Sequence, residues 1–600
     1  MFFDCLALLV ILVMALGCSV YFDCKIGKMI PIVVSCIICV ELVCGFFNHL
    51  EWGLYLLSLF MIFCIYSIAK NYKKIYLRLN ANVIFVFIVA YVLLEIHHHN
   101  SIPSTWDELA AWAVGVRYSY MTNWFPAHVG SNSFYPDYPP ATAMFHYFWM
   151  RIGNGWRDNR LYVSMGVLLV SYLVPVLDEI KIKQKKLGFL FIIDFILFFL
   201  PLSIYPVAYS DLKTDCIMGV IFAWVLYNVA LEKDIRLKVS GAGLGCFVLM
   251  MTKTYAFGFV LLALAVWFGN AIQKKDKRQF FSMLWIFVIV IAEKFAWKLY
   301  IKSQGVPVGF SMRIPHPAIW QLNAFCNYFK ALFDYSVVEN TSQTLFWING
   351  IKTPIAVFLA ILIIVGIVLA CKKREYKIIN GILLFGVMGY VMVMSYPYLA
   401  LFGEGEVAIL SSMNRYLGTI FVGVALFFLY IFIYENTFSD VEKIFPIILL
   451  CFVPCFKPQF LFIRSFMAGY KVQVKNRVEQ FSNLEKKADF IKMNVVDKSA
   501  KIHIFNGDIA GMNYILTPMR VTSPLWASGE FGLFEQFSHL YDYVWFDNLY
   551  GSIETDAFKE KYGHLFVIGS PLYNYGLYKV IYVDGLPRLL YTGKKGPVYD

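Results

Sequence analysis

The sequence predicts a mainly α-helical membrane protein that crosses the bilayer many times and ends in a small α/β domain. Of its 600 residues, 59% are hydrophobic and 15% are charged, whereas about 25% of the residues of a soluble protein are charged. Apolar runs of bilayer-crossing length recur along most of the chain. Beyond residue 464 the sequence changes to short runs in which apolar and polar residues alternate, which is the pattern of β-strands.

We expect about 13 or 14 spans, each a mostly apolar run of roughly 20 residues. The first run lacks the basic segment and the cleavage site of a signal peptide, so we interpret it as a retained span. The two runs on either side of Lys253 are short enough to form a re-entrant hairpin instead. The runs occupy residues 3–22, 28–47, 52–69, 82–98, 161–178, 187–206, 216–231, 240–252, 254–272, 280–300, 354–371, 378–397, 416–434 and 443–463.

The basic residues between the spans indicate an orientation. Short loops rich in Lys and Arg stay on the cytoplasmic side of a membrane, and with these spans all the basic loops face one side. The net charge of +12 therefore reflects membrane anchoring, and we do not expect nucleic acid as a partner. The basic residues of these loops are Lys70, Lys73, Lys74, Arg78, Lys181, Lys183, Lys185, Lys186, Lys233, Arg236, Lys238, Lys274, Lys275, Lys277, Arg278, Lys372, Lys373, Arg374 and Lys377.

The long segments 99–160, 205–215, 301–353, 396–415 and 464–600 then face outward, and we expect the chemistry on that side. Accordingly, we divide the chain into N-terminal transmembrane helices (1–98), an outer loop with surface helices (99–160), a transmembrane core (161–463) and an extracytoplasmic α/β domain (464–600).

In the C-terminal domain we expect a charged helix at about 471–493 followed by strands at 501–505, 541–546 and 578–583. Asn-Gly, Asp-Asn and Asp-Gly pairs bound these strands, as is typical of turns. The domain carries no pattern of catalytic residues, so we expect it to bind an acceptor or a partner.

The first outer loop contains adjacent carboxylates in the stretch STWDELAAWA. Thr105 and Glu108 fit a capping box, and Trp106, Leu109, Ala110 and Ala113 recur at the spacing of one apolar helix face. We therefore expect an amphipathic helix on the membrane surface. Asp107 and Glu108 are either first-turn acids favoured by the helix dipole or the working acids of an enzyme.

Farther along the same loop lies the segment FYPDYPP, followed by an aromatic-rich run from Ala141 to Trp149. The Pro-Pro pair favours a helix start, and the aromatic residues suit the headgroup region of a membrane. We expect a second surface helix here. Asp137 either caps this helix or, with Tyr138, binds substrate.

An acid at the outer end of a span, a long outer loop, many spans and an outer α/β domain together resemble the GT-C class of membrane glycosyltransferases. More closely, Trp106-Asp107-Glu108 followed by Asp137-Tyr138-Pro139-Pro140 resembles a group of bacterial GT-C-like envelope proteins with WDE…DYPP in this loop. This chain departs from that pattern by about three further spans before the loop. It also has Ala141 where the family has glycine after Pro-Pro.

The resemblance implies transfer of a sugar from a polyprenyl-phosphate or polyprenyl-diphosphate donor to a glycan or protein acceptor on the outer membrane face. It implies that Asp107, and after it Glu108, acts as the base or orienter of the acceptor hydroxyl. It further implies Asp211 as a second active-site acid and Arg415 as a contact to the donor phosphate.

Such a reaction needs a base near the acceptor hydroxyl and cations near the departing phosphate. The outer side offers Lys253, Arg313 and Arg415 as cations. Each also has a plainer interpretation. Lys253 is costly in a membrane without a partner or a watery cavity, Arg313 could be an ordinary loop cation, and Arg415 could be an interfacial anchor.

Asp211 and Asp215 are spaced so that a helix would place both carboxylates on one face. They could hold a divalent cation such as Mg²⁺ or Mn²⁺, or simply start a helix beside Lys213. The run His97-His98-His99 could suggest a metal, but consecutive helical residues point in different directions, so we expect these histidines at the membrane interface. No cofactor is certain.

Two other functions remain open from the sequence. A polymerase or ligase of lipid-linked oligosaccharides would rely on arginines and need no single loop acid. A lipid-linked-sugar flippase or transporter would carry charges at mid-bilayer and show internal symmetry. Only Glu293-Lys294 fits that pattern at face value, so transport is the less favoured alternative.

Overall fold

The computed structural model describes residues 4–128, 130–180, 187–205, 207–309, 318–334, 347–348, 351–352, 355–435, 470–497, 500–505, 509–517, 520–521, 538–547 and 556–596. The chain divides into two compact units. The first, here called the helical unit, comprises residues 1–99, 138–300 and 308–469. The second, the mixed unit, comprises residues 100–137, 301–307 and 470–600.

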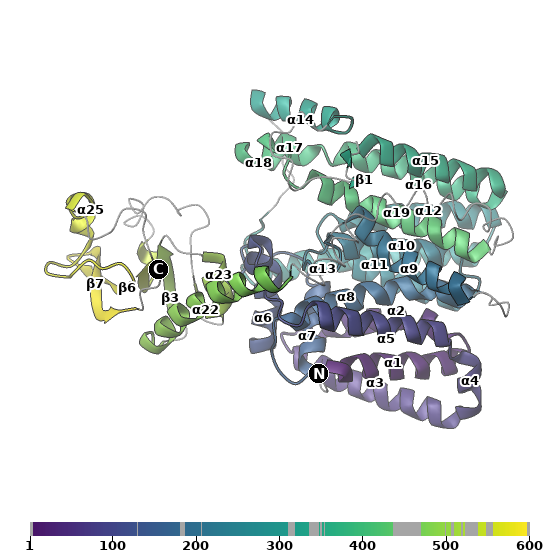
Figure 1. The fold of residues 1–600 in the computed structure, drawn as a ribbon, viewed down its shortest axis with the longest axis horizontal. Helices are drawn as coiled ribbons and strands as arrows, with labels where there is room; N and C mark the ends of the chain where they lie inside the picture. Colours follow the sequence, from purple (N-terminus) through teal and green to yellow (C-terminus); the bar gives the residue numbers. More distant parts are fainter. Residues whose placement is uncertain are drawn as a thin grey trace. The chain divides into compact units, whose positions relative to one another are not determined.

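The helical unit consists of long helices that run roughly alongside one another (Figure 1). Every predicted apolar run coincides with a helix, except 443–463, which lies outside the described residues. The helices are α1 (Asp4–Phe22), α2 (Ile26–Phe46), α3 (Leu50–Lys70), α4 (Ile75–Arg78), α5 (Ala81–His97), α7 (Ala141–Ile152), α8 (Asn159–Leu173), α9 (Leu187–Ile204), α10 (Asp215–Ala230), α11 (Ile235–Met250), α12 (Ala256–Lys274), α13 (Lys277–Ser303), α14 (Ile319–Ala331), α15 (Ile355–Lys372), α16 (Arg374–Val393), α17 (Tyr396–Ala400), α18 (Glu404–Ala408) and α19 (Met413–Glu435), with 3₁₀ turns η1 (Tyr72–Lys74) and η3 (Val174–Glu179) and a short hairpin of β1 (Trp347–Ile348) and β2 (Ile351–Lys352).

Within the described residues, eight helices are long and apolar enough to cross a membrane, or up to nine if the bent pair Tyr72–Arg78 and Ala81–His97 counts as one span. The chain thus has the character of a multi-pass membrane protein. The count is lower than the sequence predicted partly because α10 and α11 have only 16 residues each, short of the roughly 20 that a span requires.

Helix α10 lies at the centre of the helical unit, and all of its residues are buried. It packs against α8, α11, α12 and α19. The contact with α19 is close because Gly219 faces the backbone of that helix: a Cβ atom at Gly219 would lie 2.4 Å from the carbonyl oxygen of Thr419. Small residues allow such backbone approach between membrane helices.

Helices α11 and α12 form an antiparallel pair that extends along the whole of α10. At one end, Lys238 near the start of α11 and Asn270 near the end of α12 both donate to the carbonyl oxygen of Val229, at 3.1 and 2.7 Å. At the other end, Lys253 between the two helices meets Asp215, the first residue of α10, at 2.9 Å. Both arms therefore run the length of a buried helix, which argues against a shallow re-entrant hairpin.

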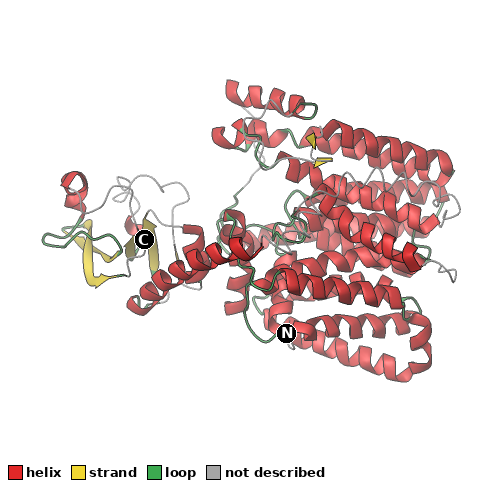
Figure 2. Cartoon of the chain, viewed as in Figure 1, coloured by secondary structure: helices red, strands yellow, loops and turns green. Residues whose placement is uncertain are grey.

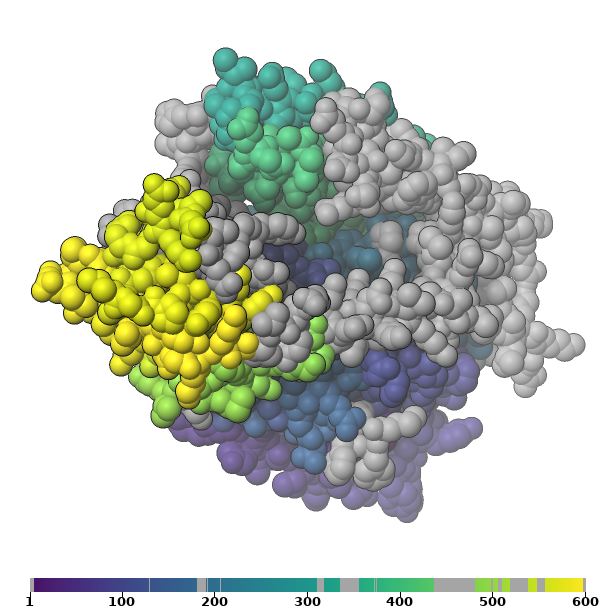
Figure 3. Space-filling view, turned by 60° about the vertical axis from the view of Figure 1, so that its left-hand side comes forward, coloured from purple at the N-terminus to yellow at the C-terminus, as the bar shows by residue number. Residues whose placement is uncertain are grey.

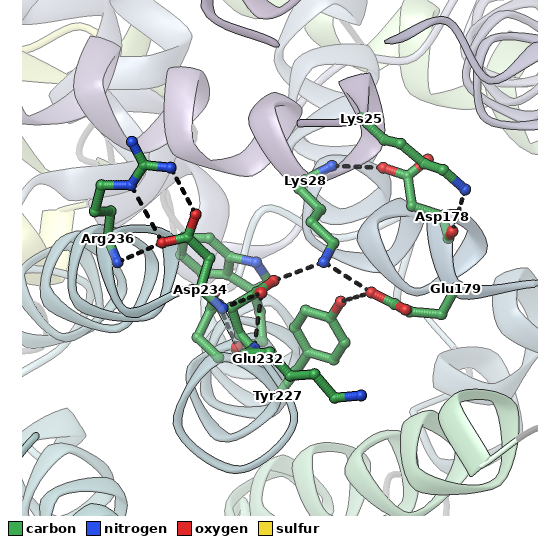
Figure 4. A network of polar contacts seen from close by, with 11 residues as sticks. Lys25, Lys28, Asp178, Glu179, Tyr227, Glu232, Asp234 and Arg236 are labelled. Atoms are coloured by element: carbon green, nitrogen blue, oxygen red, sulfur yellow. Dashed lines mark hydrogen bonds and ion pairs between the residues drawn. The ribbon is translucent and has the colours of Figure 1, made fainter. Parts of the chain in front are cut away.

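A network of ion pairs joins three helix ends of the helical unit (Figure 4). Lys28, in the first turn of α2, forms ion pairs of 2.8 Å with both Glu179 and Glu232. The hydroxyl of Tyr227 donates to Glu179 at 3.0 Å, and the main-chain N–H of Lys28 donates to the Asp178 carboxylate at 2.9 Å. The meeting of these segments agrees with the predicted topology, which places them on one side of the membrane.

The prediction of a second surface helix after the Pro-Pro pair is wrong. Helix α7 is buried over Ala141–Met150 and packs against α1, α2 and α8. Its Trp149 is fully buried beside Tyr91 of α5, and His146 bonds Ser164 of α8 at 2.6 Å. Large aromatic side chains fill a protein interior as readily as a membrane interface, so their presence alone did not decide between the two.

The mixed unit contains the strands of the C-terminal domain (Figure 2). The sheet has the order β4-β3-β5-β6-β7, in which β3 pairs in parallel with β4 and β5, and β6 pairs antiparallel with β5 and β7. The elements of the unit are the π-helical turn η2 (Glu108–Trp112), α6 (Ala113–Thr122), α22 (Tyr470–Asn494), β3 (Lys501–Phe505), α23 (Ile509–Leu516), β4 (Arg520–Val521), η9 (Ser538–Leu540), β5 (Tyr543–Phe546), α25 (Asp556–Tyr562), η10 (Gly563–Leu565), β6 (Gly576–Val583) and β7 (Leu586–Lys595).

The predicted helix and all three predicted strands of this domain are present. The Asp584-Gly585 turn joins β6 to β7 with φ of 53° and 75°, the left-handed pair that a two-residue hairpin turn requires. Alternate residues face opposite sides of the sheet: Val544 and Phe546 belong to one core, while Trp545 packs against Phe490 of α22. In the space-filling view, β6, β7 and α25 form one continuous lobe (yellow, Figure 3).

Candidate functional site

A buried carboxylate with two cations lies at the start of α10. Asp215 is fully buried, and one of its oxygens lies 2.9 Å from the ammonium of Lys253. The hydroxyl of Tyr255 donates to the same oxygen. The other oxygen lies 3.4 Å from Nε of Arg415. Segments that are far apart in the sequence therefore meet at one carboxylate.

The local structure explains why these side chains converge. Asp215 is the first residue of α10, where the helix dipole favours a negative charge. Lys253 lies in the turn between α11 and α12, and Arg415 lies in the first turn of α19. The contacts of α10 with these three helices then bring both cations to the end of α10 at which Asp215 stands.

Aromatic rings surround the two cations. The Lys253 ammonium lies 5.1 Å from the ring centroid of Tyr255 and 5.6 Å from that of Tyr416. The Arg415 guanidinium lies 5.3 Å from the Tyr416 ring. Faces of aromatic rings attract cations, so the tyrosines help to hold both positive groups away from water. Sequence reasoning missed Tyr255 and Tyr416, although each lies within two residues of a predicted cation.

The cluster of Asp215, Lys253 and Arg415, hereafter the Asp215 cluster, carries two positive charges and one negative charge. Lys253 is buried and Arg415 is about one-fifth exposed. Buried charges require partners because they have lost their hydration. Two cations at one place suit an anionic group such as a phosphate, to which Lys and Arg bind by charge-assisted hydrogen bonds.

The structure brings together two of the three cations that the sequence singled out. Lys253 has the partner that a membrane lysine needs, and Arg415 contacts Asp215 rather than acting solely as an interfacial anchor. Arg313 lies outside the described residues.

Asp211 and Asp215 do not share a helix face, which corrects the expectation drawn from their spacing. Helix α10 begins only at Asp215, and Asp211 lies in the preceding loop. There its carboxylate accepts from the main-chain N–H of Lys213 at 2.9 Å and lies 3.4 Å from the Lys213 ammonium. Asp211 therefore stabilises its own loop.

This arrangement does not fit the divalent cation considered from the sequence. Both oxygens of Asp215 already face cations, which would repel a metal ion. Across the described part of the chain, no group of three or more His, Cys, Asp or Glu residues could hold a metal.

The histidines before the first outer loop anchor the segment that leads to Asp211. His97 bonds the hydroxyl of Ser210 at 3.1 Å, and His98 bonds the carbonyl oxygen of Tyr209 at 2.7 Å. Both histidines are buried within the helical unit, and their position relative to the membrane interface stays a prediction.

The first outer loop belongs to the mixed unit, and its two acids have different environments. Glu108 is buried, and its carboxylate accepts from the main-chain N–H groups of Ser104 and Thr105 at 3.0 and 3.1 Å. Its own N–H donates to the hydroxyl of Thr105 at 3.4 Å. The predicted capping box is present, which makes Glu108 a helix-capping residue. Asp107 is half-buried and has no part in this capping box.

The first residues of the loop helix deviate from the predicted periodicity. Trp106 is 50% exposed, whereas Leu109, Ala110 and Ala113 are buried. The turn from Glu108 to Trp112 is π-helical, which adds a residue to the turn and rotates the preceding side chains off the buried face. Turns of this type are frequent at functional sites.

The capping interpretation of Asp137 is wrong. The residue that precedes the first turn of α7 is Pro140, and no side chain caps that helix. Asp137 is buried and Tyr138 is half-buried. Asp137 belongs to the mixed unit and Tyr138 to the helical unit.

No family model, curated protein or solved structure matches this chain. Its function must therefore be argued from its own residues.

Proposed function

We propose that this chain is a membrane glycosyltransferase that transfers a sugar from a polyprenyl-phosphate-linked donor to a cell-envelope glycan or another acceptor on the outer membrane face. The observation that carries the proposal is the Asp215 cluster, which places two cations, Lys253 and Arg415, together at the end of an apolar helix. A phosphate whose lipid tail remains in the bilayer needs a cationic group of this kind.

The roles follow from the chemistry of sugar transfer. Lys253 and Arg415 neutralise the phosphate as it departs, with the strength of charge-assisted hydrogen bonds. Asp107 accepts the proton of the acceptor hydroxyl as general base. Glu108 has a capping role, so the catalytic assignment passes from the pair of acids to Asp107 alone. The multi-pass helices supply the apolar surroundings that the donor lipid requires.

The test uses the purified chain in lipid vesicles with a panel of polyprenyl-phosphate sugars. Release of polyprenyl phosphate is measured for the wild type, Asp107→Asn and Arg415→Met. We expect Asp107→Asn to lower kcat by about 10²–10⁴-fold, the contribution of a general base. We expect Arg415→Met to raise the donor KM by roughly tenfold or more, because a hydrogen bond to a charged group contributes about 1.5–3 kcal/mol.

Glu404→Gln is the matched control, because Glu404 is an exposed acid of α18 in another predicted outer segment. Normal turnover by a folded Asp107→Asn variant would exclude Asp107 as the base. The arginine-dependent polymerase or ligase would then be the better assignment.

A transporter or flippase is the second candidate, and one observation favours it. Glu293 lies inside α13 with 6% exposure, and within the described residues neither of its carboxylate oxygens has a hydrogen-bond partner. Lys294 does not pair with it and instead lies over the ring of Phe257. An ionisable residue inside a span is a functional candidate. Translocation of a lipid-linked sugar without release of polyprenyl phosphate, lost in Glu293→Gln, would identify this function.

A further inference from the structure

The first outer loop and the C-terminal domain belong to the same compact unit. Residues 100–137 group with 470–600 although more than 300 residues separate them in the sequence. Helix α23 of the C-terminal domain packs against η2 and α6 of the loop. The turn η2 begins at Glu108, directly after Asp107, so its contact with α23 bears on how that carboxylate is held.

Two asparagines connect the loop to α23. Nδ2 of Asn132 donates to the main-chain oxygen of Asn513 at 3.2 Å, and Nδ2 of Asn513 donates to the main-chain oxygen of Asn132 at the same distance. Asn513 is buried with 3% exposure. A reciprocal pair of this kind fixes both the separation and the register of the two backbones, because each side-chain amide donates to the main-chain oxygen of the other asparagine.

A second contact lies one residue farther along α23. The guanidinium of Arg117, in α6, lies 4.7 Å from the ring centroid of Tyr514. Tyr514 is fully buried and packs against Phe481 of α22. Helix α6 of the first outer loop is therefore held by a contact with a buried residue of the C-terminal domain and not only by contacts at the surface of that domain.

The segment after Asn132 returns to the π-helical turn η2, which directly follows Asp107. The main-chain N–H of Phe134 donates to the carbonyl oxygen of Ala110 at 2.8 Å. The ring of Phe134 also lies 5.3 Å from that of Trp106. Phe134 thus contacts the residue immediately before Asp107 and a residue in the π-helical turn just after it.

We propose that α23 is a positioning element for Asp107, in which Asn513 holds Asn132 and thereby fixes Phe134 against both sides of the acid. The inference rests on the proposed function, because it assigns Asp107 the reaction that needs positioning. Asn513 and Tyr514 are positioning residues and not catalytic ones. The C-terminal domain is then part of the catalytic apparatus and not only a binding accessory.

The test compares Asn513→Leu and Asn132→Leu with Asn494→Leu. Asn494 is a matched control, since its side chain donates to the Phe490 carbonyl of its own helix at 2.7 Å. Hydrogen exchange of the peptide 105–112 and steady-state kinetics with a polyprenyl-phosphate sugar are measured on the same vesicle preparations.

In both test variants we expect exchange in 105–112 to accelerate by about fivefold, the effect of one lost hydrogen bond of about 1 kcal/mol. We also expect kcat to fall on the order of tenfold to a hundredfold with an unchanged donor KM, as for a displaced catalytic group. Arg117→Met should act in the same direction and Arg117→Lys should restore activity, because Lys keeps a cation over the Tyr514 ring.

Unchanged exchange in 105–112 would overturn the inference, since α23 would then not hold the turn. Faster exchange with a wild-type kcat, in a protein that Asp107→Asn inactivates, would overturn it as well. Failure of the proposed function gives a different result, namely a wild type that turns over no donor. In that case the exchange measurement still decides whether α23 holds the turn.

Discussion

The ammonium of Lys253 lies 2.9 Å from a carboxylate oxygen of Asp215, and both groups are buried. Arg415 approaches the second oxygen at 3.4 Å. Asp215 therefore contacts two cations, the buried Lys253 and the partly exposed Arg415, and helps to keep both in place. Its loss would remove the carboxylate that both cations contact.

The Asp215 cluster should consequently depend on charge balance. We expect Asp215→Asn to lower the free energy of unfolding by about 3–5 kcal/mol, the cost of removing one partner of a buried ion pair. The double variant Asp215→Asn/Lys253→Met, which removes one charge of each sign, should recover a large part of that loss. Thermal unfolding of each variant in detergent, followed by the amount of protein that still elutes as a folded peak, measures the loss of stability in the single and the double variant. Equal destabilisation in the single and double variants would contradict a charge-balance role.

Glu108 should influence stability more than catalysis. Glu108→Ala removes the acceptor for two main-chain N–H groups, so we expect it to destabilise the protein by about 0.5–2 kcal/mol. Glu108→Gln keeps an acceptor oxygen and should retain both stability and turnover. Asp107→Asn should show the opposite pattern, with a normal unfolding temperature and lost turnover. A Glu108→Gln variant that folds but does not transfer sugar would return Glu108 to the catalytic residues.

The close packing of α10 against α19 should make Gly219 sensitive to substitution. A Cβ atom there would lie 2.4 Å from the Thr419 carbonyl oxygen, so Gly219→Ala must separate the two helices. We expect a loss of about 1–3 kcal/mol, as for overpacking in a core. Gly381→Ala is the control, because a Cβ atom at Gly381 meets nothing within 4 Å. It should be neutral or slightly stabilising, since alanine favours a helix over glycine by roughly 1 kcal/mol.

Lys28 should be important for the end of the helical unit at which α2, η3 and α10 meet. Lys28→Met leaves Glu179 and Glu232 without the ion pairs that both now form with Lys28. Because Glu232 is buried, we expect a loss of about 3 kcal/mol in the free energy of unfolding. Lys377→Met, at an exposed position of α16, should change little. A comparable loss in both variants would show that any lost surface cation has this effect.

Much of the fold follows from local sequence patterns. Apolar runs of spanning length predicted the long helices of the helical unit because backbone groups in lipid must pair within their own segment. They did not predict the short helices α4, α14, α17 and α18. Alternation predicted β3, β5 and β6, and the Asp584-Gly585 pair predicted a turn at the end of β6, whereas strand β7 was not predicted. The capping box at Thr105 and Glu108 was predictable because it involves residues three positions apart.

The candidate site was less predictable because its contacts join distant segments. Lys253 was identified as a cation that needs a partner, and Arg415 as a phosphate contact or an interfacial anchor. Their spacing from Asp215 in the sequence carries no information about the packing of α10 with α11, α12 and α19. Asp215 was instead paired with Asp211, which would be correct only if the helix began four residues earlier. The burial of α7 was missed because an aromatic-rich helix has the same composition at a membrane interface and in a protein core.

The union of residues 100–137 with 470–600 also has a practical consequence. The protein cannot be divided into a membrane portion and a separable soluble portion by cutting the chain before α22, because the first outer loop would lose the helix against which it packs. A C-terminal truncation would thus expose Asn132 and Arg117, which precede the cut by hundreds of residues. Loss of activity in such a truncation would report damage at the N-terminal end of the chain, and the two pieces would need to be produced together to restore it.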